Sequence, residues 1–169
     1  IHTMHGSANT IGGQNAVLRL KYGRPPVEWA FAPAPPTVKF ALGENVKQSN
    51  FPRRGGRFPY SRMGVEATIR RSFDAAMRYK LEQEQFASEK AAGKDPRPVR
   101  RDLRLEALSS ILGGSIWIHS HCYRADEILR LLDITEEYGV RIAVLQHILE
   151  GYRIIPEMRR HGCSASSFS

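Results

Sequence analysis

The last third of the chain alternates short apolar segments with amphipathic ones, and this alternation constrains the fold more than any other feature. Residues 115–119 (SIWIH) and 140–145 (VRIAVL) are short and apolar enough to be buried strands. Residues 125–138 carry Asp and Glu in their first turn and end before Gly139, which is typical of a helix. Strands that are joined through a helix by short links form a parallel sheet. We therefore predict an α/β fold.

The same alternation continues along the following residues. A second helix is expected to begin at Pro156, because proline is tolerated at the first helical position, and to end at His161 before Gly162. Residues 163–168 are then predicted to be a third strand. Residues 115–169 would thus form one βαβαβ segment with parallel strands.

The middle of the chain, residues 44–112, is predicted to be a polar and largely helical excursion from this sheet. Apolar residues recur at close to 3.6-residue spacing over residues 63–92. A shorter helix is expected over residues 102–112, closed by Gly113. Residues 50–60 are rich in Gly, Pro and Arg and are predicted to be a loop.

The first 43 residues are rich in Gly and Pro and contain two shorter strand-like segments. Alternating apolar and basic side chains predict a strand within residues 16–22. Residues 38–42 (VKFAL) predict another strand after a Pro-rich link. No internal repeat divides the sequence, so residues 1–169 are expected to be part of a single domain.

Positive charge is concentrated in the middle of the chain. The net charge is +8, and residues 44–104 contain 15 Lys and Arg against 8 Asp and Glu, a net of +7. Such a cluster fits either a patch that binds nucleic acid or the solvated face of a helical segment. The segment lacks interleaved aromatic residues and any zinc-finger or RNP pattern, which favours the solvated helix. We therefore do not expect nucleic acid as a partner.

Other features restrict the compartment only loosely. No apolar run approaches the ~20 residues of a membrane helix, so a soluble chain is expected, either cytoplasmic or exported. The chain begins at Ile1 with no basic and apolar leader, so no signal peptide is visible. Cys122 and Cys163 are too few for a disulfide framework. A homo-oligomer is left open by the sequence.

Two histidines stand where predicted strands end. His119 closes residues 115–119, and His147 follows residues 140–145, about one βαβ unit later. Parallel strands lie ~4.8 Å apart and end at one edge, where α/β folds gather ligands and catalytic residues. The two imidazoles are therefore candidate ligands of one divalent metal ion. The alternative is that each histidine only packs or hydrogen-bonds at its strand end.

His121 follows His119 in an HxH pattern that allows two interpretations. If the strand continues, both side chains lie on one face and both could bind a metal. If the strand ends at His119, His121 lies in the following loop, where it would contact substrate or transfer a proton. The second interpretation is preferred. Cys122 is interpreted as structural, because its side chain should point away from both histidines.

Several stretches, taken together, resemble the imidazolonepropionase-like branch of the amidohydrolase superfamily. The most specific parts are IHSHxxRADEI and HxxEGY, in that order and one repeat apart. The resemblance covers nearly the whole chain. Its stretches are residues 6–23, 38–47, 61–79, 118–141 and 146–154.

That resemblance implies a TIM (β/α)8-type barrel that holds one or two divalent metals, most simply zinc, at the carboxyl ends of its strands. His119 then corresponds to the fifth-strand ligand and His147 to the sixth-strand ligand. Lys39 resembles the fourth-strand lysine that bridges two metals when carbamylated, with Glu44 as a rival. The family's first-strand HxH pair and eighth-strand aspartate have no counterpart here. The chain is therefore expected to be an internal fragment of a partial barrel, roughly strands 3 to 7.

The implied activity is hydrolysis of a C–N bond in an amide, cyclic amide or related small molecule by a metal-activated water, with this fragment inactive alone. His121 and Arg124 are the candidate catalytic residues that would orient substrate, with Asp126 in support. Glu150 would fix the His147 ring. Alternatively, these charged side chains only pair or cap near helix starts. A basic nucleic-acid-binding module and a non-catalytic α/β interaction domain remain as other interpretations.

Overall fold

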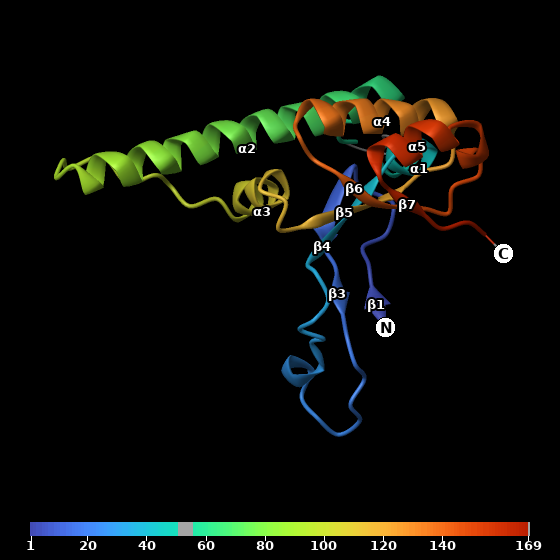
Figure 1. The fold of residues 1–169 in the computed structure, drawn as a ribbon, viewed down its shortest axis with the longest axis horizontal. Coiled ribbons are helices and arrows are strands. Elements are labelled where there is room, and N and C mark those ends of the chain that lie inside the picture. Colours follow the sequence, from blue (N-terminus) through green and yellow to red (C-terminus); the bar gives the residue numbers. More distant parts are fainter. Residues whose placement is uncertain (51–55, 169) are drawn as a thin grey trace.

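The computed structural model describes residues 1–50 and 56–168 as a mixed α/β fold around one mainly parallel sheet (Figure 1). Five of the described strands lie in the order β2-β4-β5-β6-β7. β2 is antiparallel to β4, and the other neighbours pair in parallel. The strands are β2 (Ile11–Gln14), β4 (Thr37–Ala41), β5 (Trp117–His121), β6 (Ile142–Gln146) and β7 (Ser164–Ala165).

Helices make the connections between the parallel strands, and α2 reaches well past the sheet (Figure 1). None of the described helices is long and apolar enough to span a membrane. β1 (His2–Thr3) and β3 (Ala16–Val17) form a separate antiparallel pair, and β2 of the main sheet lies between them in the sequence. The helices are α1 (Gly43–Asn50), α2 (Arg62–Ala91), α3 (Leu103–Leu112), α4 (Ala125–Glu137), α5 (Ile155–His161) and the short 3-10 helices η1 (Pro26–Trp29) and η2 (Gly151–Arg153).

The two faces of the sheet carry different side chains. Phe40 and Ile118 are fully buried in the apolar core formed with α2, α3 and α4. Phe40 stacks on Phe73 of α2, with ring centroids 6.1 Å apart. Side chains alternate along a strand, so the neighbours of these residues point to the opposite face. The register places two of those neighbours, Lys39 of β4 and His119 of β5, side by side.

The sequence explains where α2 begins and what it buries. The Ser61 hydroxyl accepts a hydrogen bond from the Gly64 N–H, which caps the first turn. Val65, Ile69 and Phe73 recur at four-residue spacing and are all buried. The buried positions of α2 end at Tyr79, and the rest of the helix extends into solvent.

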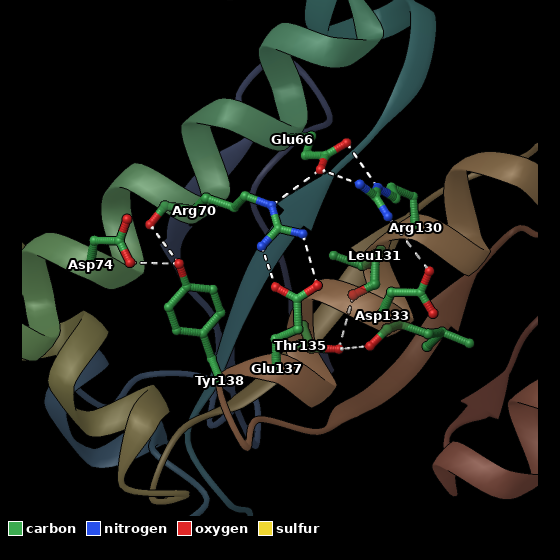
Figure 2. A network of polar contacts seen from close by, with 10 residues as sticks. Glu66, Arg70, Asp74, Arg130, Leu131, Asp133, Thr135, Glu137 and Tyr138 are labelled. Atoms are coloured by element: carbon green, nitrogen blue, oxygen red, sulfur yellow. Dashed lines mark hydrogen bonds and ion pairs between the residues drawn. The ribbon is translucent and has the colours of Figure 1, made fainter.

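A network of charged side chains joins α2 to α4 (Figure 2). Arg70 of α2 forms ion pairs with Glu66 on its own helix and with Glu137 of α4. Arg130 of α4 pairs with the same Glu66, at 2.9 Å. Because partly exposed ion pairs each contribute little stability, the network chiefly fixes how the two helices lie against each other.

The predicted order of elements is confirmed for most of the chain. α2 and α3 correspond, to within one residue at each end, to the two helices predicted over residues 63–92 and 102–112. β5, α4, β6, α5 and β7 follow one another in the predicted order, and their strands are parallel. Of the loop predicted over residues 50–60, residues 56–60 have no helix or strand, Asn50 lies in a helix, and residues 51–55 lie outside the described residues.

Three details of the prediction are wrong. The strand expected within residues 16–22 is limited to Ala16–Val17, and Leu18 after it forms an isolated antiparallel bridge with Ala30. The strand expected over residues 163–168 shortens to Ser164–Ala165, which are in register with Val144 and Leu145 of β6. Helix α1 was not predicted. It begins at Gly43, whose φ of 78° turns the chain directly out of β4.

Candidate active site

The carboxyl ends of three parallel strands meet at one edge of the sheet. Ala41, His121 and Gln146 are the last residues of β4, β5 and β6, and they pair across the strands. His147 follows immediately after β6. In parallel α/β sheets this edge is the usual place for ligands and catalytic groups.

His121 and His147 lie together at this edge. Their ring centroids are 5.3 Å apart and the rings are tilted by 59°. His121 is buried, with 4% of its surface exposed. The backbone of His147 has a φ of 50°, in the left-handed region that non-glycine residues rarely occupy. Such strain is found disproportionately at functional sites, where the surrounding structure holds it.

Two aromatic side chains flank the histidine pair. The Phe168 ring stacks on His147, with centroids 5.4 Å apart and an interplanar angle of 19°. Tyr123 meets His121 edge-on at 4.6 Å, and its centroid lies 6.4 Å from that of Phe168. The four rings therefore form a continuous aromatic cluster, contributed by β5 and by the segments that follow β5, β6 and β7.

His119 lies two residues before the end of β5 and has different neighbours. The Gln146 side-chain amide donates to His119 Nδ1 at 3.2 Å. The His119 ring also meets His2 edge-on, with centroids 5.1 Å apart. The structure thus brings His121, not His119, next to His147.

The expectation that β5 ends at His119, with His121 in the following loop, is wrong. Backbone hydrogen bonds continue past His119 on both sides of β5. The His121 carbonyl accepts from Leu42 N–H at 3.0 Å, and Cys122 N–H donates to the Gln146 carbonyl at 3.4 Å. These bonds keep His121 in the strand, on the same face as His119.

Lys39 is buried in the middle of β4, with 4% of its surface exposed. Its ammonium group donates to the Gln146 side-chain carbonyl. The same Gln146 amide donates to Met4 Sδ at 2.9 Å, besides His119. Burial lowers the pKa of Lys39 below the usual range of an amine. Lys39 is therefore held next to the histidines by Gln146, whose side-chain amide is itself oriented by its bonds to Met4 and His119.

The three histidines of the site are held neutral. Burial lowers the pKa of His121 to about 4, and the nearby His147 and Lys39 add to the shift. The pKa of His119 is also about 4, chiefly through burial. Burial and Lys39 lower the pKa of His147. Neutral imidazole is the form that ligates metals.

The donors at this edge fit part of a metal site. His121 and His147 offer two neutral imidazoles at the carboxyl ends of adjacent strands. No cluster of three or more His, Cys, Asp or Glu suited to a metal occurs within residues 1–50 and 56–168. The pair is thus a partial ligand set.

Arg124 and Glu150 have local partners at the start of α4. Arg124 forms two hydrogen bonds of 2.9 Å with Asp126 and is exposed. A carboxylate oxygen of Glu150 accepts from the Ala125 N–H at 2.9 Å, which satisfies a backbone donor of the first turn. Glu150 therefore supports α4, and within the described part of the chain neither side chain hydrogen-bonds to the histidine pair.

 The Arg124 guanidinium also lies 3.8 Å from a Glu127 carboxylate oxygen.

Cys122 points away from the histidines, as expected for a structural cysteine. It is buried in the apolar core on the helix side of the sheet. Burial raises the pKa of its thiol to about 12, so the thiolate is not populated near neutral pH.

Sequence reasoning missed two polar residues of this edge. Asn45 of α1 lies 3.2 Å from His121 through its side-chain nitrogen, but the helix that carries it was not predicted. The signal for that helix is Gly43 followed by Glu44 and Lys47, which form an i,i+3 ion pair. Gln146 ends an apolar segment just before His147, and a polar residue at that position marks it as part of the site.

The chain has measurable similarity to known proteins. No protein-family model matches it. It is 29% identical over 165 residues to Amidohydrolase tasK of Hapsidospora irregularis, a match that covers 90% of this chain and 16% of that protein. It is 30% identical to the solved structure of an amidohydrolase from Thermotoga maritima, with a TM-score of 0.82, covering 96% of this chain and 40% of that one.

The chain is amidohydrolase-like in sequence and in structure. Both similar proteins are named amidohydrolases. Their names support an amidohydrolase-type family for this chain and its classification as a hydrolase. The chain spans only 16% and 40% of the lengths of these two proteins.

Proposed function

We propose that this chain is part of a metal-dependent amidohydrolase that hydrolyses a C–N bond in a small molecule. The observation that carries the proposal is the pair of neutral imidazoles, His121 and His147, at the carboxyl edge of a parallel sheet. The similarity to two proteins named amidohydrolases supports the same reaction class. The motifs IHSHxxRADEI and HxxEGY are the reason to propose the imidazolonepropionase-like branch.

The sheet is proposed to be an arc of a TIM barrel, roughly its strands 3 to 7. Four parallel strands, β4 to β7, support this arrangement. Helices cover one face of the arc, as they cover the outside of such a barrel. The opposite face carries Lys39, His119, His121 and Gln146, which would then point to the barrel interior.

His121 and His147 are proposed to hold a divalent cation, most simply zinc, with Lys39 as a further ligand if it is carbamylated. The ligand on β5 is thereby assigned to His121 instead of His119, because His121 is the neighbour of His147. When bound, such a cation supplies Lewis acidity, which activates water and polarises a carbonyl group. These residues alone would leave part of the coordination sphere of the cation to other ligands.

The other residues of the edge are proposed to shape the site. Gln146 holds the Lys39 amine in place through its side-chain carbonyl. Tyr123 and Phe168 pack against the two imidazoles and restrict the rotation of their rings. Arg124 remains a candidate for orienting substrate, but its ion pair with Asp126 would have to open first.

The metal assignment is tested by zinc titration of the 169-residue chain in an isothermal calorimeter. His121→Ala and His147→Ala should each weaken zinc binding by more than about tenfold, because each removes a ligand. His161→Ala is the control, since His161 is buried at the end of α5 and bonds to β6 and α4. Equal zinc affinity in the wild type and both site variants would contradict the assignment.

Activity is tested in a longer protein that contains this chain. Hydrolysis of a panel of acyclic and cyclic amides should require a divalent metal and should be lost in His121→Ala and His147→Ala. His119→Ala should retain more activity than either, because its ring is not part of the proposed pair. Full hydrolysis after exhaustive chelation would exclude the metal-dependent reaction.

A further inference from the structure

We propose that Asn45 competes with the metal ion for His121, so that the site binds metal only when the Asn45 amide turns away. This inference rests on the proposed function, because it assumes that His121 is a ligand. It assigns a role to Asn45 of α1, which is not one of the proposed metal ligands. Its consequence is that removing Asn45 strengthens metal binding instead of weakening it.

The hydrogen bond between Asn45 and His121 determines where the imidazole carries its proton. Asn45 Nδ2 lies 3.2 Å from His121 Nε2 and 2.9 Å from Ser7 Oγ. An amide nitrogen has two donor hydrogens and no acceptor capacity. His121 Nε2 must therefore accept, and in a neutral ring the proton then resides on Nδ1.

This arrangement leaves His121 with one ring lone pair, and Asn45 occupies it. A metal binds the unprotonated nitrogen of a neutral imidazole. In the tautomer that the Asn45 bond selects, that nitrogen is Nε2. One lone pair cannot serve an amide donor and a metal at once. Metal binding through Nε2 therefore requires that the Asn45 hydrogen bond be broken.

The two histidines of the pair differ in this respect. Within residues 1–50 and 56–168, no hydrogen-bond partner is found at either ring nitrogen of His147, whose ring is held by stacking on Phe168. Of the two histidines, His121 is the one with a ring nitrogen, Nε2, that faces a hydrogen-bond donor. A cation arriving at this edge would find His147 available first and His121 only after the amide moves.

Asn45 is well placed to act in this way, because its backbone is fixed while its side chain can turn. It lies in the first turn of α1, directly after β4. Glu44 anchors that turn through ion pairs with Lys47 and with Arg62 of α2. Releasing His121 therefore needs only a side-chain rotation of Asn45, with loss of its bond to Ser7.

The test compares zinc affinity in the 169-residue chain for the wild type, Asn45→Ala and Asn15→Ala. Removing one competing hydrogen bond should tighten zinc binding about fivefold in Asn45→Ala. Asn15→Ala is the matched control, because the Asn15 amide donates to Thr37 Oγ1 and does not contact His121. It should leave zinc affinity unchanged.

A second measurement reports on the tautomer directly. Long-range ¹H–¹⁵N spectra of the metal-free wild type should show the His121 proton on Nδ1, whereas Asn45→Ala should show both tautomers. Weaker or unchanged zinc binding in Asn45→Ala would overturn the competition, and so would a proton on Nε2 in the wild type. His121→Ala is titrated in parallel. If it binds zinc as well as the wild type, the metal site itself fails, and this inference fails with it.

Discussion

The two faces of the sheet are built from alternate residues of the same strands, yet they differ in almost every property. On the helix-covered face, Phe40 and Ile118 are fully buried among apolar side chains of α2, α3 and α4. On the opposite face, Lys39 and His121 are also buried, but they are polar and depend on a few hydrogen bonds. Burial is similar on both faces, and its energetic effect is opposite.

The difference indicates which face maintains the fold and which is specialised for chemistry. Burial of apolar area stabilises the folded chain, by roughly 25 cal/mol for each Å². Burial of ionisable groups costs free energy, and here it appears as lowered pKa values of Lys39, His119 and His121. We infer that apolar burial on the helix-covered face offsets the free energy that burial of ionisable groups costs on the histidine face.

Truncation of the apolar face should give the largest loss of stability. Phe73 of α2 is fully buried and stacks on Phe40. Phe73→Ala should reduce the free energy of unfolding by about 3–5 kcal/mol, because it leaves a cavity in the core. Urea unfolding followed by circular dichroism measures this. A loss smaller than that caused by His121→Ala would contradict the inference that the helix-covered face maintains the fold.

Acid should reveal the cost of the histidine face. An exposed imidazole titrates near 6.5, whereas the pKa values of His119 and His121 are about 4 in the folded chain. Between these values the unfolded chain binds more protons, so stability should fall as the pH drops from 6.5 toward 4. His121 accounts for at most about 3 kcal/mol of this fall.

The acid prediction is checked by urea midpoints at pH 7.5, 6.5, 5.5 and 4.5. A variant with His119→Gln and His121→Gln should show a flatter profile between pH 6.5 and 5.5, because these two groups no longer take up protons. A wild-type stability that is constant over that range would mean that the two rings are not held neutral by the fold.

His161 tests whether a buried histidine outside the site is structural. Its Nε2 accepts the Ile142 N–H at 2.9 Å, and its Nδ1 lies 3.2 Å from a Glu136 carboxylate oxygen. His161→Ala should lower the free energy of unfolding by about 1–3 kcal/mol, because the buried N–H loses its acceptor. His161→Gln should recover part of that loss. Zinc binding should remain at the wild-type level in both variants.

The smallest effect is expected at the junction between α2 and α4. Arg70→Ala removes the ion pairs to Glu66 and Glu137 (Figure 2). These side chains are partly exposed, so the loss should be only about 1 kcal/mol and should shrink in high salt. Thermal unfolding at low and high ionic strength would check this. A salt-independent loss of several kcal/mol would show that the junction belongs to the core.

The sequence predicted the elements of the fold well because their signals are local. The helix over residues 63–92 and the parallel strands around residues 115–145 follow from apolar spacing and from glycine positions. Helix α1 was not predicted, because it is short and polar and its start depends on the left-handed φ of Gly43.

The site was predicted less completely, because it depends on where β5 ends. The HxH pattern allowed either His119 or His121 to meet His147, and only hydrogen bonds to both neighbouring strands extend β5 to His121. The pairing of Asn45 with His121 joins residues 76 positions apart in the sequence. No periodicity within one segment could reveal such a contact.

The central claim, that His121 and His147 bind one cation, is tested most directly by zinc titration of the histidine ring nitrogens. Long-range ¹H–¹⁵N spectra of the ¹⁵N-labelled chain should show His121 Nε2 and one nitrogen of His147 shifting together as zinc is added. The rings of His2, His119 and His161 should keep their metal-free positions. Joint shifts of His119 and His147, with His121 unchanged, would contradict the account and return the β5 ligand to His119.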